Sequence, residues 1–257
     1  MNDILFKIVF GSAQNEPILR ALLNAILALT GENRIVELQI LNPHIDKEYL
    51  RERGAILDVK ARDGVGRLYN IEVQVNDQPA YIKRSIYYVA RLFGEQIEKG
   101  ESYDRIERTI GISILDFRLF TEFDDLHSTF RFYDSAHNHE LSDILELHYI
   151  ELTKFKGDKP HLLRTPLEKW LHILKFGELY QNGLETLPDQ LREEEGIKMA
   201  VDSMRQALAS DEVREMIEFR VKALRDEATR MERARQESWE QGKEQGIERG
   251  REQGIEQ

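Results

Sequence analysis

The order of hydrophobic and polar positions predicts a helix near the start of the chain, with three strands after it. Apolar side chains recur at helical spacing before Gly31, which is a typical helix stop. Alternating patterns then favour strands, and the last two flank the turn sequence Asp63-Gly64-Val65-Gly66. The expected bounds are 15–29 for the helix and 35–41, 55–61 and 67–75 for the strands.

The middle of the chain predicts a second helix and a buried strand. From Pro79 the apolar residues return to helical spacing, and Gly100 is the expected end. The apolar stripe of this helix comprises Ile82, Ile86, Val89, Phe93 and Ile97. Residues 109–117 are apolar and β-branched, which is typical of a buried strand, and 128–152 predict two more strands. The core order is therefore helix, three strands, helix, strand.

Beyond Pro160 the pattern is helical to the last residue, and glycine recurs every four residues from Gly242 to Gly254. Four residues turn a helix by about 400°, so these glycines form one slowly drifting stripe. Two interpretations stay open. The tail is either a soluble segment that frays, since each helical glycine costs about 1 kcal/mol, or a close-packed seam for self-association. We expect a domain at 1–160 and a helical region with the repeat tail at 161–257.

Composition narrows the classes of function. The chain has 257 residues, no cysteine and a net charge of −11 from 36 basic and 47 acidic side chains. The lack of cysteine excludes disulfides, a thiolate nucleophile and cysteine-based zinc sites. No apolar run approaches the roughly 20 residues of a membrane span, and no signal peptide is recognised, so we expect a cytoplasmic protein without membrane contact. The negative charge argues against nucleic-acid binding through bulk positive charge but leaves a local basic groove open.

The hairpin at 55–75 carries the residues of chemical interest. Its apolar and polar side chains alternate, which places Asp58 on the polar face of one strand and Glu72 and Gln74 on the polar face of the other. Both apolar faces are buried together only if paired positions sum to an even number, because a slip of one residue turns a strand over. A turn centred on Val65 then makes Asp58 and Glu72 direct neighbours, with Cβ atoms about 5 Å apart.

Two carboxylates at this distance repel each other unless a cation lies between them. Mg²⁺ suits such a position because it takes oxygen ligands and keeps several waters. We predict that Asp58, Glu72 and the carbonyl of Val73 bind Mg²⁺ or Mn²⁺, and that Gln74 orients a water beside the metal. The alternative is an ordinary amphipathic hairpin whose polar face meets solvent, since Glu-x-Gln is a common triplet.

The helix that follows carries Arg84, Tyr88 and Arg91 at positions i, i+4 and i+7, which share one face. Two guanidinium groups and a phenol on one face are suited to a phosphate backbone, which arginine binds through its planar fork. The alternative is a solvated helix face, because Glu95 lies on the same side.

The chain resembles the PD-(D/E)XK nuclease superfamily in its core order, in Asp58 and in the Glu72-x-Gln74 strand. Within that superfamily it is most similar to the Rpn-like branch of recombination-promoting nucleases, a family also described as transposases. The segments that carry the resemblance are FKIVFG at 6–11, LLNAIL at 22–27, ILNP at 40–43, ILDVKA at 56–61, YNIEVQV at 69–75, IKRSIYYVARLFGEQIEKGESY at 82–103, GISILDF at 111–117, YIELTKF at 149–155 and the glycine-repeat tail.

This resemblance implies an α/β fold, with a mixed central sheet flanked by helices and a helical C-terminal region. It also implies Mg²⁺-dependent endonuclease hydrolysis of DNA, linked to recombination or transposition. We expect a homo-oligomer, because two cuts are useful to recombination. Carried over by position, Asp58 and Glu72 are metal ligands, and Gln74 stands where the superfamily usually has lysine. Glutamine carries no charge, so its role is limited to orienting water or substrate. Lys7, in the FK motif, is a candidate for the missing positive charge.

Two other functions compete with this hypothesis. The first keeps the fold and removes the activity, which gives a pseudonuclease that binds DNA or regulates. The second is an oligomeric scaffold that acts through its long charged C-terminal helix.

Overall fold

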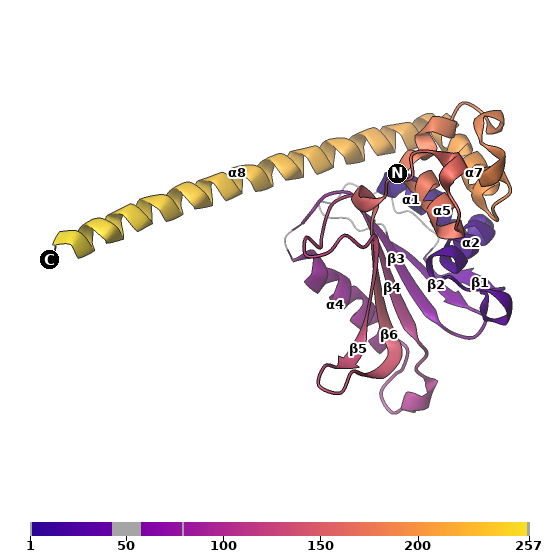
Figure 1. Cartoon of the computed structure of the whole chain (residues 1–257), viewed down its shortest axis with the longest axis horizontal. Coiled ribbons are helices and arrows are strands. Elements are labelled where there is room, and N and C mark those ends of the chain that lie inside the picture. Colours follow the sequence, from indigo (N-terminus) through magenta and orange to yellow (C-terminus); the bar gives the residue numbers. More distant parts are fainter. Residues whose placement is uncertain (1, 43–57, 79, 256–257) are drawn as a thin grey trace. The chain divides into compact units, whose positions relative to one another are not determined.

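Six strands of the described chain form one mixed sheet in the order β1-β2-β3-β4-β6-β5 (Figure 1). The computed structural model describes residues 2–42, 58–78 and 80–255. β3, β4 and β6 run parallel, and the pairs β1–β2, β2–β3 and β5–β6 are antiparallel. The bounds are Leu38–Ile40 for β1, Asp58–Asp63 for β2, Leu68–Gln74 for β3, Thr109–Leu115 for β4, His127–Asp134 for β5 and His139–Glu151 for β6.

Helices cover both faces of this sheet (Figure 1). α4 packs on one face, against β3, β4 and β6, and α1, α2, α5 and α7 build the main hydrophobic core on the other. The α-helices are α1 (Asp3–Gly11), α2 (Glu16–Ile26), α4 (Tyr81–Gly94), α5 (Pro166–Phe176), α6 (Asp189–Arg192), α7 (Ile197–Ala209) and α8 (Asp211–Ile255). The predicted mixed sheet flanked by helices is confirmed.

The predicted elements are found with shifted bounds. The helix at 15–29 corresponds to α2, the strand at 67–75 to β3, the strand at 109–117 to β4 and the pair within 128–152 to β5 and β6. The strand predicted at 35–41 shortens to β1, and α1 is a helix that the pattern analysis did not predict. Of the strand predicted at 55–61, residues 55–57 lie outside the described residues.

The second predicted helix is confirmed as α4, but its predicted apolar stripe is wrong in part. Ile82 and Ile86 are 41% and 44% exposed, whereas the buried residues of α4 are Tyr81, Ser85, Val89 and Leu92. α4 presents this side to the sheet because the side chains of the sheet beneath it are partly polar. The Ser85 hydroxyl, for example, hydrogen-bonds the Tyr149 hydroxyl of β6 at 2.7 Å.

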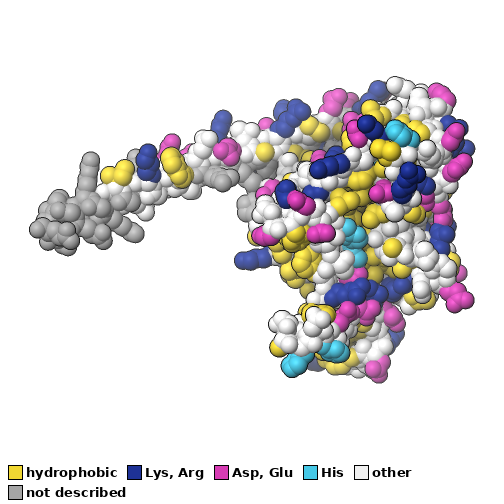
Figure 2. Space-filling model, viewed as in Figure 1, with side chains coloured by type: hydrophobic (Ala, Val, Ile, Leu, Met, Phe, Trp, Pro, Cys, Tyr) yellow, Lys and Arg dark blue, Asp and Glu magenta, His cyan; other side chains and the backbone are white. Residues whose placement is uncertain are grey.

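A charged network ties β4, β5 and β6 together on the other face of the sheet. His148 hydrogen-bonds Glu146 and, at 2.8 Å, His127, while Arg108 binds Glu146 at 2.6 Å and Arg131 binds it as well. Burial alone would raise the pKa of Glu146, but hydrogen bonds from His148 and Arg131 bring it down to about 2. Figure 2 shows histidine side chains above a band of Lys and Arg over β5 and β6.

The domain boundary predicted at residue 160 does not match the division of the structure. One compact unit spans 1–217 and a second spans 218–257. The boundary moves because α5 and α7 share the core of the sheet domain: Trp170 is fully buried and its ring lies 5.9 Å from that of Phe10 in α1. The glycine-repeat segment is helical within α8 as far as Ile255. None of the described helices combines the length and apolar character that crossing a bilayer requires.

Gly111 sets how closely α4 approaches the sheet. A Cβ atom at this position would lie 2.3 Å from Val89 Cγ2 and 3.0 Å from Leu147 Cδ2. Because valine is stiff at χ1, we expect Gly111→Ala to lower the free energy of unfolding by roughly 1–3 kcal/mol. Urea denaturation measures the change.

Gly94→Ala is the matched control, since a Cβ there meets nothing within 4 Å at the last residue of α4. We expect it to change stability by no more than about 1 kcal/mol, in the stabilising direction. Equal stability of the Gly111→Ala protein and the wild type would contradict the close approach.

Candidate active site

Asp58 and Glu72 are direct partners in the antiparallel pairing of β2 with β3, so the predicted register is confirmed. Their side chains share the face that α4 covers, because Glu72 also pairs with Ser113 of β4. The Gln74 side chain lies one pleat further along the same face, opposite Leu115. The hairpin therefore brings two carboxylates and an amide together beneath one helix.

Backbone directions on β3 place a carbonyl beside these carboxylates. The Gln74 carbonyl accepts from the amide of Asp116 at 2.9 Å, so the even-numbered residues of β3 direct their backbone groups towards β4. Asp58 and Glu72 thus form a pair without backbone hydrogen bonds, in which Cα atoms lie only about 4.5 Å apart. The Val73 carbonyl points the other way, towards β2, whose described residues begin at Asp58.

Glu72 is a buried acid. It is 3% exposed, because α4 and the hydroxyl-bearing side chains of Tyr81, Ser113 and Tyr149 surround it. Burial raises the pKa of Glu72 to about 7, Arg84 opposes this rise, and the negative charge of Asp58 adds to it. A group whose pKa is shifted this far by burial is typical of functional sites.

Asp58 is held by an amide and approached by two lysines. Asn42 Nδ2 donates to Asp58 Oδ1 at 3.2 Å, and Lys60 Nζ lies 3.9 Å from Asp58 Oδ2. Lys7 Nζ donates to the backbone carbonyls of Asp58 at 2.8 Å and Asn42 at 2.5 Å. Burial lowers the pKa of Lys7 to about 8, against the attraction of Asp58 and with the repulsion of Lys60. The structure thus places Lys7, predicted near the site, on the backbone that carries Asp58.

Sequence reasoning missed Lys60 and Asn42. Lys60 carries a signal that could have been used, since it follows Asp58 by two positions and so lies on the same face of β2. Asn42 carries none, because only the pairing of β1 with β2 brings it to Asp58.

Arg84 reaches into the site from α4. Its Nη2 atom lies 3.0 Å from Glu72 Oε1 and 2.9 Å from Gln74 Oε1, and its Nη1 atom binds Gln78. The guanidinium also lies over the ring of Tyr81, 5.0 Å from the ring centroid. Arg84 is therefore part of the carboxylate cluster, whereas its sequence position indicated a phosphate contact.

The other two residues predicted on this helix face lie differently. Arg91 is exposed and its Nε atom donates to Glu95 at 2.7 Å. Tyr88 is half-buried, with its ring 5.7 Å from that of Tyr87. The structure brings Arg84 to the carboxylates and leaves Arg91 in an ion pair at the helix surface.

The donor set fits a hard divalent cation. Mg²⁺ is commonly held by one or two carboxylates and several waters, and Asp58, Glu72 and the Val73 carbonyl offer oxygen atoms of this kind on adjacent strands. Histidine, cysteine and acidic residues of the described chain form no cluster of three or more that could hold a metal. A cation here would therefore rely on two side chains, a carbonyl and solvent.

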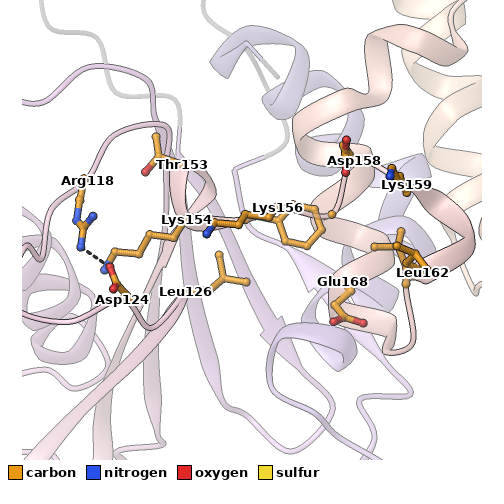
Figure 3. Close-up of a pocket in the computed structure, with 13 residues that line it drawn as sticks. Arg118, Asp124, Leu126, Thr153, Lys154, Lys156, Asp158, Lys159, Leu162 and Glu168 are labelled. Carbon is orange, nitrogen blue, oxygen red and sulfur yellow. Dashed lines mark hydrogen bonds and ion pairs between the residues drawn. The ribbon is translucent and has the colours of Figure 1, made fainter.

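A cavity of about 740 Å³ opens at the same edge of the sheet (Figure 3). Glu151 of β6 pairs with Leu115 and Leu115 with Gln74, so this part of β6 lies two strands, about 10 Å, from the candidate site. Lys154 pairs with Glu151 at 2.6 Å and Arg118 with Asp124 at 2.5 Å. The charged residues that line the cavity are Arg118, Asp124, Lys154, Lys156, Asp158, Lys159 and Glu168.

Two lysine side chains that line the cavity are not engaged in an ion pair with any described residue. Lys156 and Lys159 are exposed and form no ion pair with any residue of the described ranges. The Glu168 carboxylate, by contrast, caps α5 by accepting the amides of Arg164 and Thr165 at 2.7 and 2.9 Å. The cavity therefore holds two exposed lysines and the exposed acid Asp158, at the end of the sheet where Gln74 lies.

Comparison with known proteins identifies the family. Residues 1–234 match the family model described as PD-(D/E)XK nuclease family transposase. The chain belongs to this family. No curated protein and no solved structure matches the chain. Membership of the PD-(D/E)XK nuclease family transposases agrees with the mixed sheet flanked by helices, and it confirms the resemblance found in the sequence.

The raised pKa of Glu72 predicts a pH-dependent stability in the metal-free protein. The unfolded state releases this proton near pH 4.5 and the folded state near pH 7, so the folded state binds more protons between these values. The free energy of unfolding should therefore fall as pH rises from about 4.5 to 7, by at most about 3 kcal/mol from this group. Glu72→Gln should remove that part of the decline, as measured by urea unfolding at pH 5 and pH 8 with a chelator present.

Glu122→Gln, at an exposed position, is the control and should leave the pH profile of the wild type unchanged. Parallel profiles for the wild type and the Glu72→Gln protein would show that Glu72 titrates as an ordinary solvated acid.

Proposed function

We propose that this PD-(D/E)XK family member is a Mg²⁺-dependent DNA endonuclease that acts in recombination or transposition. The observation that carries the proposal is the register of Asp58 against Glu72. Three oxygen donors on adjacent strands make a site for a hard cation beside which a phosphodiester can be hydrolysed. Mn²⁺ has similar ligand preferences and is expected to replace Mg²⁺.

Each residue of the site has a separate role in the proposed hydrolysis. A divalent cation held here would supply Lewis-acid chemistry, lowering the pKa of a water and offsetting charge on the scissile phosphate. Asp58 and Glu72 would hold that cation, and the Gln74 side chain would orient the attacking water through its amide. Lys7 and Lys60 add positive charge beside Asp58, where a lysine in place of Gln74 would otherwise have supplied it.

The substrate is expected to extend from this site over the neighbouring cavity. Lys156 and Lys159 there are exposed cations, and Arg118 is half of an exposed ion pair that a phosphate can replace. Local positive charge of this kind attracts a phosphate backbone even though the net charge of the whole chain is −11. Cleavage of both DNA strands is served by a homo-oligomer, in which two copies each supply one site.

The nuclease activity is tested with isosteric variants of the two acids. Asp58→Asn and Glu72→Gln keep the shape of each side chain and remove a charged ligand, so each should lower the rate of Mg²⁺-dependent plasmid cleavage by at least roughly 10³-fold. Gel analysis of supercoiled plasmid, with and without a chelator, measures the rate.

Asp134→Asn, at an exposed acid of β5, serves as the control and should cleave like the wild type. Cleavage by both site variants at the wild-type rate would rule out Asp58 and Glu72 as metal ligands. A wild-type protein that binds DNA and leaves it intact across the Mg²⁺ and Mn²⁺ titration would favour the pseudonuclease.

An oligomeric scaffold is the second candidate, and the length of α8 favours it. This helix spans 45 residues, and Trp239 and Ile247 expose 67% and 50% of their surface. Apolar side chains exposed on a charged helix are suited to contact with a second copy.

Removing residues 218–257 separates assembly from catalysis, since 1–217 form a compact unit. We expect the shortened protein to keep its metal-dependent cleavage within about tenfold of the full chain, and to sediment as a smaller species. A full chain that self-associates but cleaves no plasmid, together with a folded 1–217 protein that no longer self-associates, would instead favour the scaffold.

A further inference from the structure

Arg84 already neutralises the carboxylate that a metal would need. Its Nη2 atom bridges Glu72 Oε1 at 3.0 Å and Gln74 Oε1 at 2.9 Å. Its Nη1 atom binds Gln78, and the ring of Tyr81 lies beneath the guanidinium. Gln74, Gln78 and Tyr81 thus help to hold the guanidinium of Arg84 against Glu72.

This ion pair is shielded from water. The side chain of Glu72 is 4% exposed and that of Arg84 is 24% exposed. The Arg84 Nε atom is buried and has no hydrogen-bond partner within the described chain. The guanidinium therefore makes its hydrogen bonds through its two terminal nitrogens, and no hydrogen bond within the described residues fixes its Nε atom.

A guanidinium and a divalent cation do not share one carboxylate at low cost. The strength of Coulomb repulsion rises as the local dielectric falls, and the site lies beneath α4. A metal bound to Glu72 at about 2.0–2.1 Å would place two positive groups on a single side chain. One of them has to leave.

We propose that Arg84 is a resident counter-ion that competes with the divalent cation for Glu72 and so sets the metal affinity of the site. The inference rests on the proposed function, because it takes Asp58 and Glu72 to be the metal ligands. Arg84 holds the Glu72 side chain in place while no metal is bound, and metal binding releases the guanidinium from Glu72.

A purely structural ion pair makes the opposite prediction. If Arg84 only positions Glu72 for the metal, its removal leaves the carboxylate without its hydrogen bonds and weakens metal binding. Competition predicts that removal strengthens metal binding. The direction of the change therefore decides between the two roles, without reference to catalysis.

Isothermal titration calorimetry with Mn²⁺ alone, at pH 8.5 on the full-length protein, measures this direction. Arg84→Met keeps the length and apolar contacts of the side chain and removes its charge. We expect this variant to bind Mn²⁺ at least about tenfold more tightly than the wild type, because a competing cation is gone. Arg84→Lys keeps the charge but lacks the planar fork that joins three partners, so it should fall between the two.

Arg91→Met is the matched control, since Arg91 lies two turns along α4 in an exposed ion pair with Glu95. It should bind Mn²⁺ like the wild type. Glu72→Gln should abolish the signal in both the wild-type and the Arg84→Met backgrounds, which places the bound ion at Glu72. Circular dichroism and thermal unfolding confirm that each variant is folded, and Arg84→Lys carries the test if Arg84→Met is not.

The outcomes separate the two proposals. Equal or weaker Mn²⁺ binding by folded Arg84→Met, with plasmid cleavage intact in the wild type, overturns the competition and leaves the nuclease in place. No Mn²⁺ binding by any of the proteins overturns both the competition and the metal site. Tighter binding by Arg84→Met, abolished by Glu72→Gln, supports both.

Discussion

A carboxylate buried against a second carboxylate is the constraint on which this structure depends. Glu72 is 3% exposed and lies directly opposite Asp58, so the fold loses hydration of the acid and gains repulsion from its neighbour. Such a pair persists only where other contacts compensate. Here Arg84 supplies the opposite charge from α4, and Asn42 holds Asp58 from the end of β1.

The position of α4 follows from that constraint. The helix buries Tyr81 and Ser85 and leaves Ile82 and Ile86 exposed, because the sheet beneath it is partly polar. Gly111 lets the helix approach closely enough for side chains of α4 to reach β3 and β6. The helix thus leaves two isoleucines exposed and covers Glu72 with polar side chains, and such a loss of apolar burial is common at functional sites.

The two faces of the sheet differ in polarity. On the core face, β4 and β6 contribute Ile112, Ile114 and Ile150 to a continuous core with α1, α2, α5 and α7. On the other face, the same strands contribute Ser113 and Tyr149 to the surroundings of Glu72. A rigid apolar layer thus supports the acidic one and limits the movement of the strands that carry Asp58 and Glu72.

The sequence by itself determined the hairpin and the Asp58–Glu72 register, because a period of two and a turn centred on Val65 allow only one pairing that buries both apolar faces. Its motifs also determined the family. It did not determine what surrounds the acids. Arg84, Asn42 and Lys7 meet them through contacts between separate elements. The rotation of α4 was decided by the polar layer it covers, and the extent of the first unit by α5 and α7 joining its core. Local periodicity records which face of an element is apolar, whereas burial of a charged group depends on what packs over it, and only the tertiary structure sets that.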